Sequence, residues 1–189
     1  MLSRTNEIIR SVTEIHLATR FTDPPFSVRE FSKYYPAFQF QASTDLPAGI
    51  DGQLVVQDGR NYVFFRKGQS HVRNRFTICH EVGHAFLHVE EEAFKCDAVE
   101  HRGRDYFLHR PIKEQEADFF AAELLVPLPM LDRFVLDDLN TVKEKEHQEL
   151  VRVLAEKFMV SKPCMQLRLE DLNDIRRTTA GRGVYLKRA

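Results

Sequence analysis

The feature that most constrains this chain is a pair of histidines one helical turn apart, with a glutamate beside the first. His80, Glu81 and His84 lie in residues 75–88, RFTICHEVGHAFLH. An α-helix turns about 100° per residue, so His80 and His84 share one face and can bind a single metal ion. Catalytic zinc takes imidazole ligands and keeps one position for water, whose proton a neighbouring carboxylate can accept. The spacing therefore predicts a zinc site built on a helix.

Apolar residues surround this motif on most sides of the predicted helix. They are Phe76, Ile78, Cys79, Val82, Ala85, Phe86 and Leu87. A helix that is apolar nearly all round is buried, and its buried polar groups need partners that offset the loss of water. A metal ion is one such partner, and a hydrogen-bonded pair of core histidines is the alternative. The pattern favours the metal.

The composition is that of one soluble domain. The chain has 189 residues, of which 43% are hydrophobic and 29% charged, and this length supports one core. The three cysteines are odd in number and form no CxxC pair, which argues against a disulfide framework and suits a reducing compartment. No segment has the apolar run of a signal peptide or a membrane span. We therefore expect a cytoplasmic protein that does not bind membranes.

Charge is distributed unevenly, although the chain as a whole carries −1. From residue 151 onward basic residues outnumber acidic ones, while the first 150 residues are acidic on balance. A basic end can contact nucleic acid or an acidic partner, but such a surface is more often simply solvated.

Periodicity and turn signals predict an α+β fold. Two β-branched and aromatic runs, 53–57 and 61–66, flank Asp58, Gly59 and Arg60, which indicates a hairpin in a small antiparallel sheet packed on the HExxH helix. Residues 90–110 show no regular pattern. Helical spacing predicts further helices at 6–21, 28–35, 113–126, near residue 131, at 142–158 and after Ser161.

A catalytic zinc needs one more protein ligand. The downstream candidates are His88, His101, His109, Glu114, Glu116 and Asp118. His88 lies two turns beyond His80, about 12 Å along the axis, so a continuous helix cannot bring both to one ion. Glu114 and Asp118 share a face of the helix at 113–126, where one carboxylate can bind metal and the other can orient His80 or His84. Three small residues let this helix approach closely: Ala117, Ala121 and Ala122.

Two segments together resemble the ImmA/IrrE family of zinc metallopeptidases. RFTICHEVGHAFLH at 75–88 and EQEADFFAAELLVP at 114–127 match the family helices rFTxAHExGHxxLH and ExEAnxFAaxLLmP. The resemblance is good over about residues 53–127, and Gly52 ahead of the strand pair also fits. It implies a zincin-like protease core over residues 1–130 and a helical, helix-turn-helix-like region over 131–189.

By this resemblance one catalytic Zn²⁺ is held by His80, His84 and Glu114, and Glu81 is the general base. Asp118 occupies the Asn/Asp position of the family motif, where it orients a ligand. A donor to the developing oxyanion is also expected, and its candidates are Tyr62, Tyr106 and His109.

Two positions depart from the family pattern. Cys79 stands where alanine is usual and Val126 where methionine is usual, and neither is an implied ligand. We expect Cys79 to be an inert packing residue, with redox sensitivity or metal contact as the alternative.

The resemblance also implies the reaction. Family members cleave a protein substrate, typically a helix-turn-helix repressor of the XRE type, and so derepress stress-response or mobile-element genes. Two further readings stay open: a zincin scaffold that binds a repressor without cutting it, and a DNA-binding regulator whose C-terminal helix pair exposes Arg168. We favour packing or substrate docking for these helices over direct nucleic-acid binding. The sequence leaves the oligomeric state open.

The strand predicted at 61–66 has two readings of its own. It is either an exposed edge along which an extended substrate lies or an ordinary part of the core.

Overall fold

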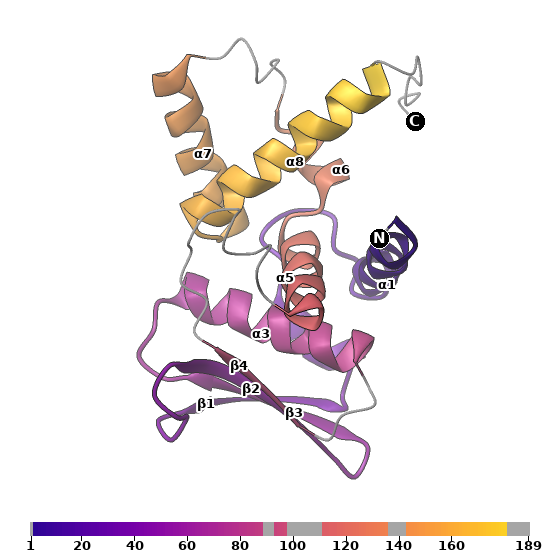
Figure 1. Ribbon diagram of the computed structural model, residues 1–189, viewed down its shortest axis with the longest axis vertical. Helices are drawn as coiled ribbons and strands as arrows, with labels where there is room; N and C mark the ends of the chain where they lie inside the picture. Colours follow the sequence, from indigo (N-terminus) through magenta and orange to yellow (C-terminus); the bar gives the residue numbers. More distant parts are fainter. Residues whose placement is uncertain (1, 89–92, 98–110, 136–142, 181–189) are drawn as a thin grey trace.

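The architecture comes from a computed structural model that describes residues 2–88, 93–97, 111–135 and 143–180. A four-stranded sheet forms its lower layer in Figure 1. The strands are β1 (Phe38–Ser43), β2 (Ile50–Gln57), β3 (Arg60–Arg66) and β4 (Ala93–Asp97), in the order β1-β3-β2-β4. The predicted hairpin is confirmed, because Asp58 and Gly59 both adopt positive φ (50° and 73°) between β2 and β3. Such turns match the twist of antiparallel strands.

The sheet differs from the prediction in its pairing. It is mixed rather than antiparallel, since β1 runs parallel to β3 from Phe38 opposite Asn61 to Ser43 opposite Arg66. β3 therefore has a partner on each side, so of the two readings of 61–66 the exposed edge is wrong and the interior strand is confirmed. Alternation along one strand does not reveal its place in a sheet, which depends on distant segments. The stretch 90–110, predicted to be irregular, contains β4, which pairs antiparallel with β2.

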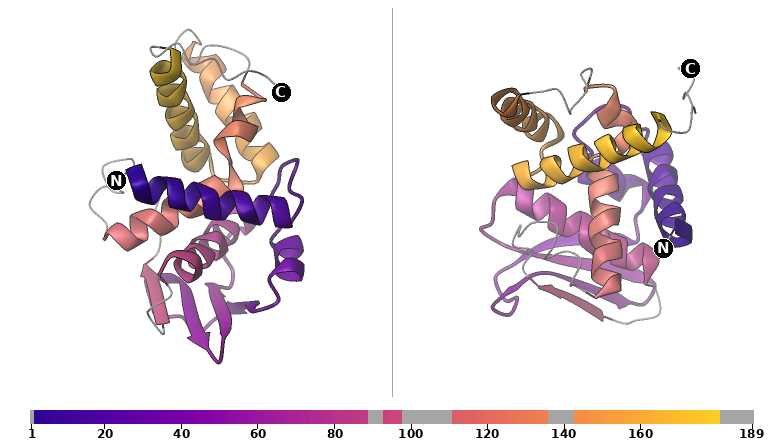
Figure 2. Two further views of the ribbon diagram at one scale, coloured as in Figure 1. Left: turned by 90° about the vertical axis from the view of Figure 1, so that its right-hand side faces the viewer. Right: turned by 45° about the horizontal axis from the view of Figure 1, so that its top comes forward.

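Helices cover one face of this sheet. In Figure 1, α3 (His71–Leu87) lies across the sheet and α5 (Ile112–Leu125) crosses α3 on its other side. Figure 2 shows α1 (Leu2–Ala18) alongside α5, and the buried residues of α1 are Ile8, Val12 and Ile15. Serine side chains cap the start of helices. Ser27 Oγ accepts from Glu30 N in α2 (Val28–Tyr34), and Ser70 Oγ accepts from Arg73 N in α3. Ser161 Oγ likewise accepts from Cys164 N at the start of α8 (Lys162–Ala180). The predicted α+β class is confirmed.

The crossing of α3 and α5 depends on small residues. A Cβ atom added to Gly83 would lie 3.2 Å from the Cα of Ala117 and 3.2 Å from the Cβ of Phe120. Ala117 and Ala121 have no exposed surface. The helix that carries the two histidines can therefore lie backbone against backbone with the acidic helix.

The C-terminal helices pack on the same core. They are α6 (Leu128–Asp132), α7 (Glu144–Phe158) and α8 (Lys162–Ala180), and Met159 joins α7 to α8 in the left-handed conformation with φ 54°. Buried apolar residues from both halves of the chain belong to one cluster, from Ile8 to Leu172. The division of the chain at residue 130 stays a prediction.

Arg168 is buried, which makes the prediction of an exposed Arg168 on α8 wrong. The side chain is 1% exposed; its Nε and Nη2 donate to the carbonyl of Val126 at 3.0 and 2.9 Å, and Nη2 forms an ion pair with Glu123. The side chain therefore reaches inward to the end of α5.

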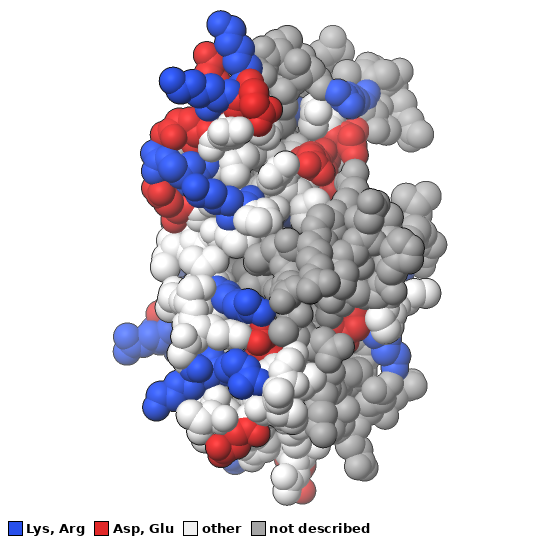
Figure 3. Space-filling view, turned by 60° about the vertical axis from the view of Figure 1, so that its left-hand side comes forward, with Lys and Arg blue, Asp and Glu red and all other residues white. Residues whose placement is uncertain are grey.

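The outward face of α7 carries charges of both signs. Figure 3 shows acidic and basic side chains interleaved over the upper part of the molecule, and Arg152 pairs there with Glu149 and Glu156. A surface of mixed charge lacks the uniform positive potential of a nucleic-acid groove.

Within the described ranges, none of the helices combines the length and apolar character needed to cross a membrane.

Candidate metal centre

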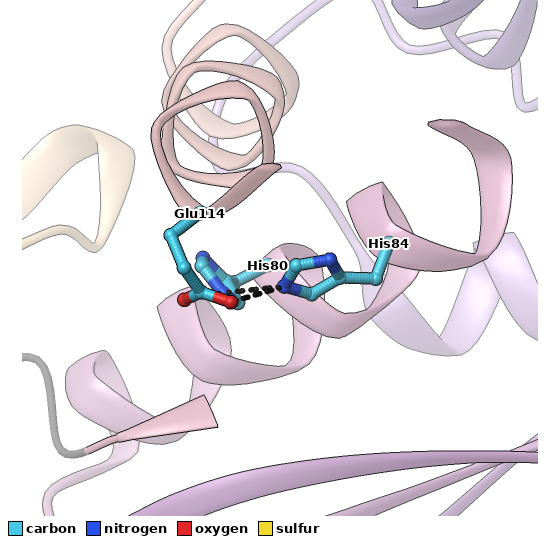
Figure 4. Close-up of side chains that lie close together, drawn as sticks. All are labelled: His80, His84 and Glu114. Atoms are coloured by element: carbon cyan, nitrogen blue, oxygen red, sulfur yellow. Dashed lines mark hydrogen bonds and ion pairs between the residues drawn. The ribbon is translucent and has the colours of Figure 1, made fainter. Parts of the chain in front are cut away.

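Three side chains from two helices point to one spot. His80 and His84 project from α3, and Glu114 from the first turn of α5 (Figure 4). The Nε2 atoms of the two histidines are 3.1 Å apart, and the Glu114 carboxylate oxygens lie 3.3 Å from Nε2 of His80 and 3.2 Å from Nε2 of His84. Ligands placed about 2.1 Å from a tetrahedral ion are about 3.4 Å apart. The three side chains therefore fit a single metal ion.

Burial and hydrogen bonding set the charges of this cluster. The side chains of His80 and His84 are at most 1% exposed, and that of Glu114 is 17% exposed. Burial lowers the pKa of His84, which favours the neutral imidazole that binds metals. Burial alone raises the pKa of Glu114, but hydrogen bonds and charge interactions with the two histidines outweigh it and lower that pKa. A neutral imidazole beside an ionised carboxylate is the donor set that a divalent cation needs.

Asp118 lies against the far side of His80. Its Oδ1 is 2.8 Å from Nδ1 of His80, and the residue is 6% exposed. A carboxylate at this nitrogen holds the proton on Nδ1 and leaves the Nε2 lone pair directed at the cluster. The sequence left open which histidine Asp118 serves, and the structure brings it to His80.

His84 has a different partner on its far side. Its Nδ1 lies 3.0 Å from Nδ1 of His88, and Nε2 of His88 lies 2.9 Å from Oε2 of Glu116. His88 therefore lies beside His84 and outside the cluster of His80, His84 and Glu114, as its position two turns beyond His80 predicts. The sequence does not reveal that Glu116 contacts His88, because this contact joins two helices. The i, i+4 spacing of His84 and His88 is the signal that their two rings meet.

Glu81 follows His80 in α3 and has no exposed surface. The backbone of β2 passes close to it, because a Cβ atom added to Gly52 would collide with Oε1 of Glu81 and lie 2.6 Å from Cγ2 of Thr77. Gly52 lies inside β2 rather than ahead of the strand pair. A glycine within a strand is the signal for such a close approach, and it identifies Gly52 as the residue that leaves room for the Glu81 carboxylate.

The remaining predicted residues are distributed elsewhere. Tyr62 lies on the interior strand β3, opposite Gln39 and Val55. Tyr106 and His109 lie outside the described residues. Cys79 is 1% exposed within the apolar cluster, and burial raises the pKa of its thiol to about 12. A neutral thiol in this setting packs as a small apolar side chain.

Comparison with protein-family models gives one match. Residues 42–170, more than half of the chain, match the model for Peptidase M78, described as an IrrE N-terminal-like domain. The matched range contains the three clustered residues, Glu81 and Asp118. Comparison with curated proteins finds no match.

Proposed function

We propose that this chain, which belongs to the Peptidase M78 family of IrrE N-terminal-like domains, is a zinc-dependent endopeptidase. The family is one of peptidases, so the reaction that the site has to perform is hydrolysis of a peptide bond. The observation that carries the proposal is the convergence of His80 Nε2, His84 Nε2 and the Glu114 carboxylate beside the buried Glu81. Two imidazoles and one carboxylate are a donor set that zinc adopts in catalytic sites, where a fourth position stays open.

Zinc held by His80, His84 and Glu114 would supply a Lewis acid that polarises the peptide carbonyl and lowers the pKa of a water molecule. The Glu81 carboxylate accepts the proton of the attacking water, whose oxygen forms the new C–O bond. The same carboxyl then delivers that proton to the leaving amine as the C–N bond breaks. Asp118 accepts the Nδ1 hydrogen of His80 and keeps Nε2 unprotonated.

The proposed substrate is a protein, and within that class a helix-turn-helix repressor of the XRE type. Support for the narrower choice is the resemblance of 75–88 and 114–127 to ImmA/IrrE peptidases. Cleavage of such a repressor would derepress stress-response or mobile-element genes, and a repressor substrate implies a reaction in the cytoplasm.

We further propose that the substrate chain lies extended along β4. Among the described strands, β4 and β1 each have a single neighbour in the sheet, and β4 contacts the helix that carries both histidines. The outward N–H and C=O groups of such a strand can pair with a peptide backbone. β4 therefore takes the place of 61–66 as the proposed substrate-binding strand, because β3 lies inside the sheet.

Cleavage assays with Glu81→Gln distinguish two hypotheses: that the protein is an endopeptidase, and that it is a binding module that holds a repressor without cutting it. The wild-type chain with zinc should release fragments from a candidate repressor, and a chelator should stop the reaction. Glu81→Gln should bind zinc normally and release none, whereas Glu149→Gln, the same change on the exposed face of α7, should cleave normally. Wild-type turnover by Glu81→Gln would refute the mechanism. Stable repressor binding by the zinc-loaded wild type without fragments would favour the binding module.

A further inference from the structure

We propose that His88, Glu116 and Arg4 form a relay that positions His84 and couples helix α1 to metal binding. The relay deepens the proposed function and rests on His84 being a ligand. It starts at the nitrogen of His84 that faces away from the cluster. Because Nε2 of His84 lies 3.2 Å from Glu114, Nδ1 is the nitrogen that needs a partner outside the centre, and Nδ1 of His88 lies 3.0 Å away.

The direction of the hydrogen bonds follows from ligand chemistry. A metal ligand keeps its lone pair on Nε2, so the proton of neutral His84 is on Nδ1 and is donated to Nδ1 of His88. His88 then carries its own proton on Nε2, which lies 2.9 Å from Oε2 of Glu116 and donates to it. Two neutral rings and one carboxylate therefore form a chain with a single consistent order of donors and acceptors.

Arg4 extends this chain to the N-terminal helix. Its Nε lies 3.3 Å from Oε1 of Glu116, and its Nη2 donates to the carbonyl of Leu87 at 2.9 Å. Leu87 is the last residue of α3, so one guanidinium contacts both the relay carboxylate and the end of the histidine helix.

Exposure increases along the relay. The side chain of His88 is 4% exposed, that of Glu116 18% and that of Arg4 42%. Water screens the outer contact most strongly, so the contributions should decrease from His88 to Arg4.

The two histidine ligands thus have different hydrogen-bond partners on the side that faces away from the metal cluster. His80 reaches a carboxylate directly, at Asp118, whereas His84 reaches Glu116 through the ring of His88. All of the carboxylates concerned lie on α5. The relay therefore accounts for Glu116, an acidic residue of this helix that the metal cluster itself does not use.

The test measures metal affinity rather than peptidase activity. Zinc dissociation constants come from chelator competition, and the visible spectrum of bound Co²⁺ reports ligand geometry. His88→Phe keeps a ring of similar size but removes both nitrogens, and it should weaken zinc binding about 10–100-fold. His88→Gln can accept from His84 with its carbonyl oxygen and donate to Glu116 with its amide nitrogen, so it should restore most of the affinity.

The outer relay residues supply the graded comparison. Glu116→Leu should weaken binding less than His88→Phe does, and Arg4→Met should do so by only a few-fold. Glu7→Gln removes the other carboxylate partner of Arg4, at 3.0 Å on the exposed face of α1, and should leave the affinity unchanged. If His88→Phe does not fold, Glu116→Leu carries the test, because its side chain is partly exposed.

Two results would overturn the relay. One is wild-type zinc affinity in His88→Phe, or in Glu116→Leu where that variant carries the test. The other is an equal loss of affinity in His88→Gln and His88→Phe, which would make ring packing the cause instead of hydrogen bonding. Both outcomes are separate from the proposed function, since a chain that binds zinc tightly without cutting would refute the peptidase and leave the relay standing.

Discussion

Replacing Arg168 by methionine tests how firmly the C-terminal helix α8 is joined to the helix that carries Glu114. Arg168 and its partner Glu123 are 1% and 6% exposed. Methionine keeps an apolar stem but removes the cation, so the Glu123 carboxylate stays buried without its counter-ion. Removing one member of a buried ion pair destabilises a protein by about 3–5 kcal/mol, and losing the donor to the Val126 carbonyl adds about 1 kcal/mol.

Urea unfolding of the metal-free protein measures this change. With a denaturant slope of about 2 kcal/mol/M, the combined loss of about 5 kcal/mol lowers the unfolding midpoint by about 2.5 M. The double variant Arg168→Met/Glu123→Leu replaces the pair by apolar side chains and should recover most of the lost stability. Arg152→Met is the matched control. Arg168 pairs with Glu123 and, at 3.2 Å, with Asp171, and Arg152 likewise has two carboxylate partners but lies on the exposed face of α7. The midpoint of Arg152→Met should therefore stay close to wild type.

A midpoint for Arg168→Met as high as that of Arg152→Met would refute this reasoning. It would mean that Arg168 is not buried in solution. The C-terminal helices would then be free to present Arg168 to DNA, as the alternative reading of the sequence requires. Salt-dependent duplex binding would be the measurement to follow.

Three further predictions concern the site and the helix α1 that packs beside it. Gly52→Ala should abolish cleavage while zinc is retained, because its methyl group would displace the Glu81 carboxylate; normal turnover would contradict the close approach of β2. Zinc at about 1,000 times its dissociation constant stabilises the folded state by about 4 kcal/mol. The thermal unfolding midpoint should therefore rise by about 10 °C on adding zinc. Glu114→Ala should remove this shift. His16 lies on α1, where its Nε2 is 2.9 Å from the carbonyl oxygen of Leu124, and burial lowers its pKa below 6.5, as it does for His84. The unfolded chain therefore takes up protons at higher pH than the folded chain, and the metal-free protein should lose stability as pH falls below about 6.5. Urea midpoints across this range should fall less steeply for His16→Phe, and an unchanged slope would show that His16 has no part in it.

Much of the site could be predicted from short-range pattern. The spacing of His80 and His84 places both on one helical face, and the same rule places Glu114 and Asp118 together on α5. The hairpin between β2 and β3 follows from the turn at Asp58 and Gly59, whose conformation is local. Each of these inferences needs only the geometry of a single element.

Other features could not be predicted in this way. The parallel pairing of β1 with β3 and the strand β4 depend on hydrogen bonds between segments far apart in the chain. An exposed Arg168 follows from reading the C-terminal helices as a DNA-binding helix-turn-helix, yet Glu123 of α5 and the carbonyl of Val126 hold the side chain inside. A charged residue of this kind becomes a buried one only when a distant partner is present.

The sequence by itself determined which residues can meet within a helix or a turn, and so it determined the HExxH spacing of α3 and the acidic face of α5. Only the tertiary structure decided that Asp118 lies beside His80, whereas His88 lies beside His84 and Glu116 beside His88. The physical reason is that helical periodicity sets angles within one helix, whereas the rotation and spacing between two helices are set by packing. Here that packing is the close contact of Gly83 with Ala117, which brings α5 near enough for its carboxylates to reach the histidines of α3.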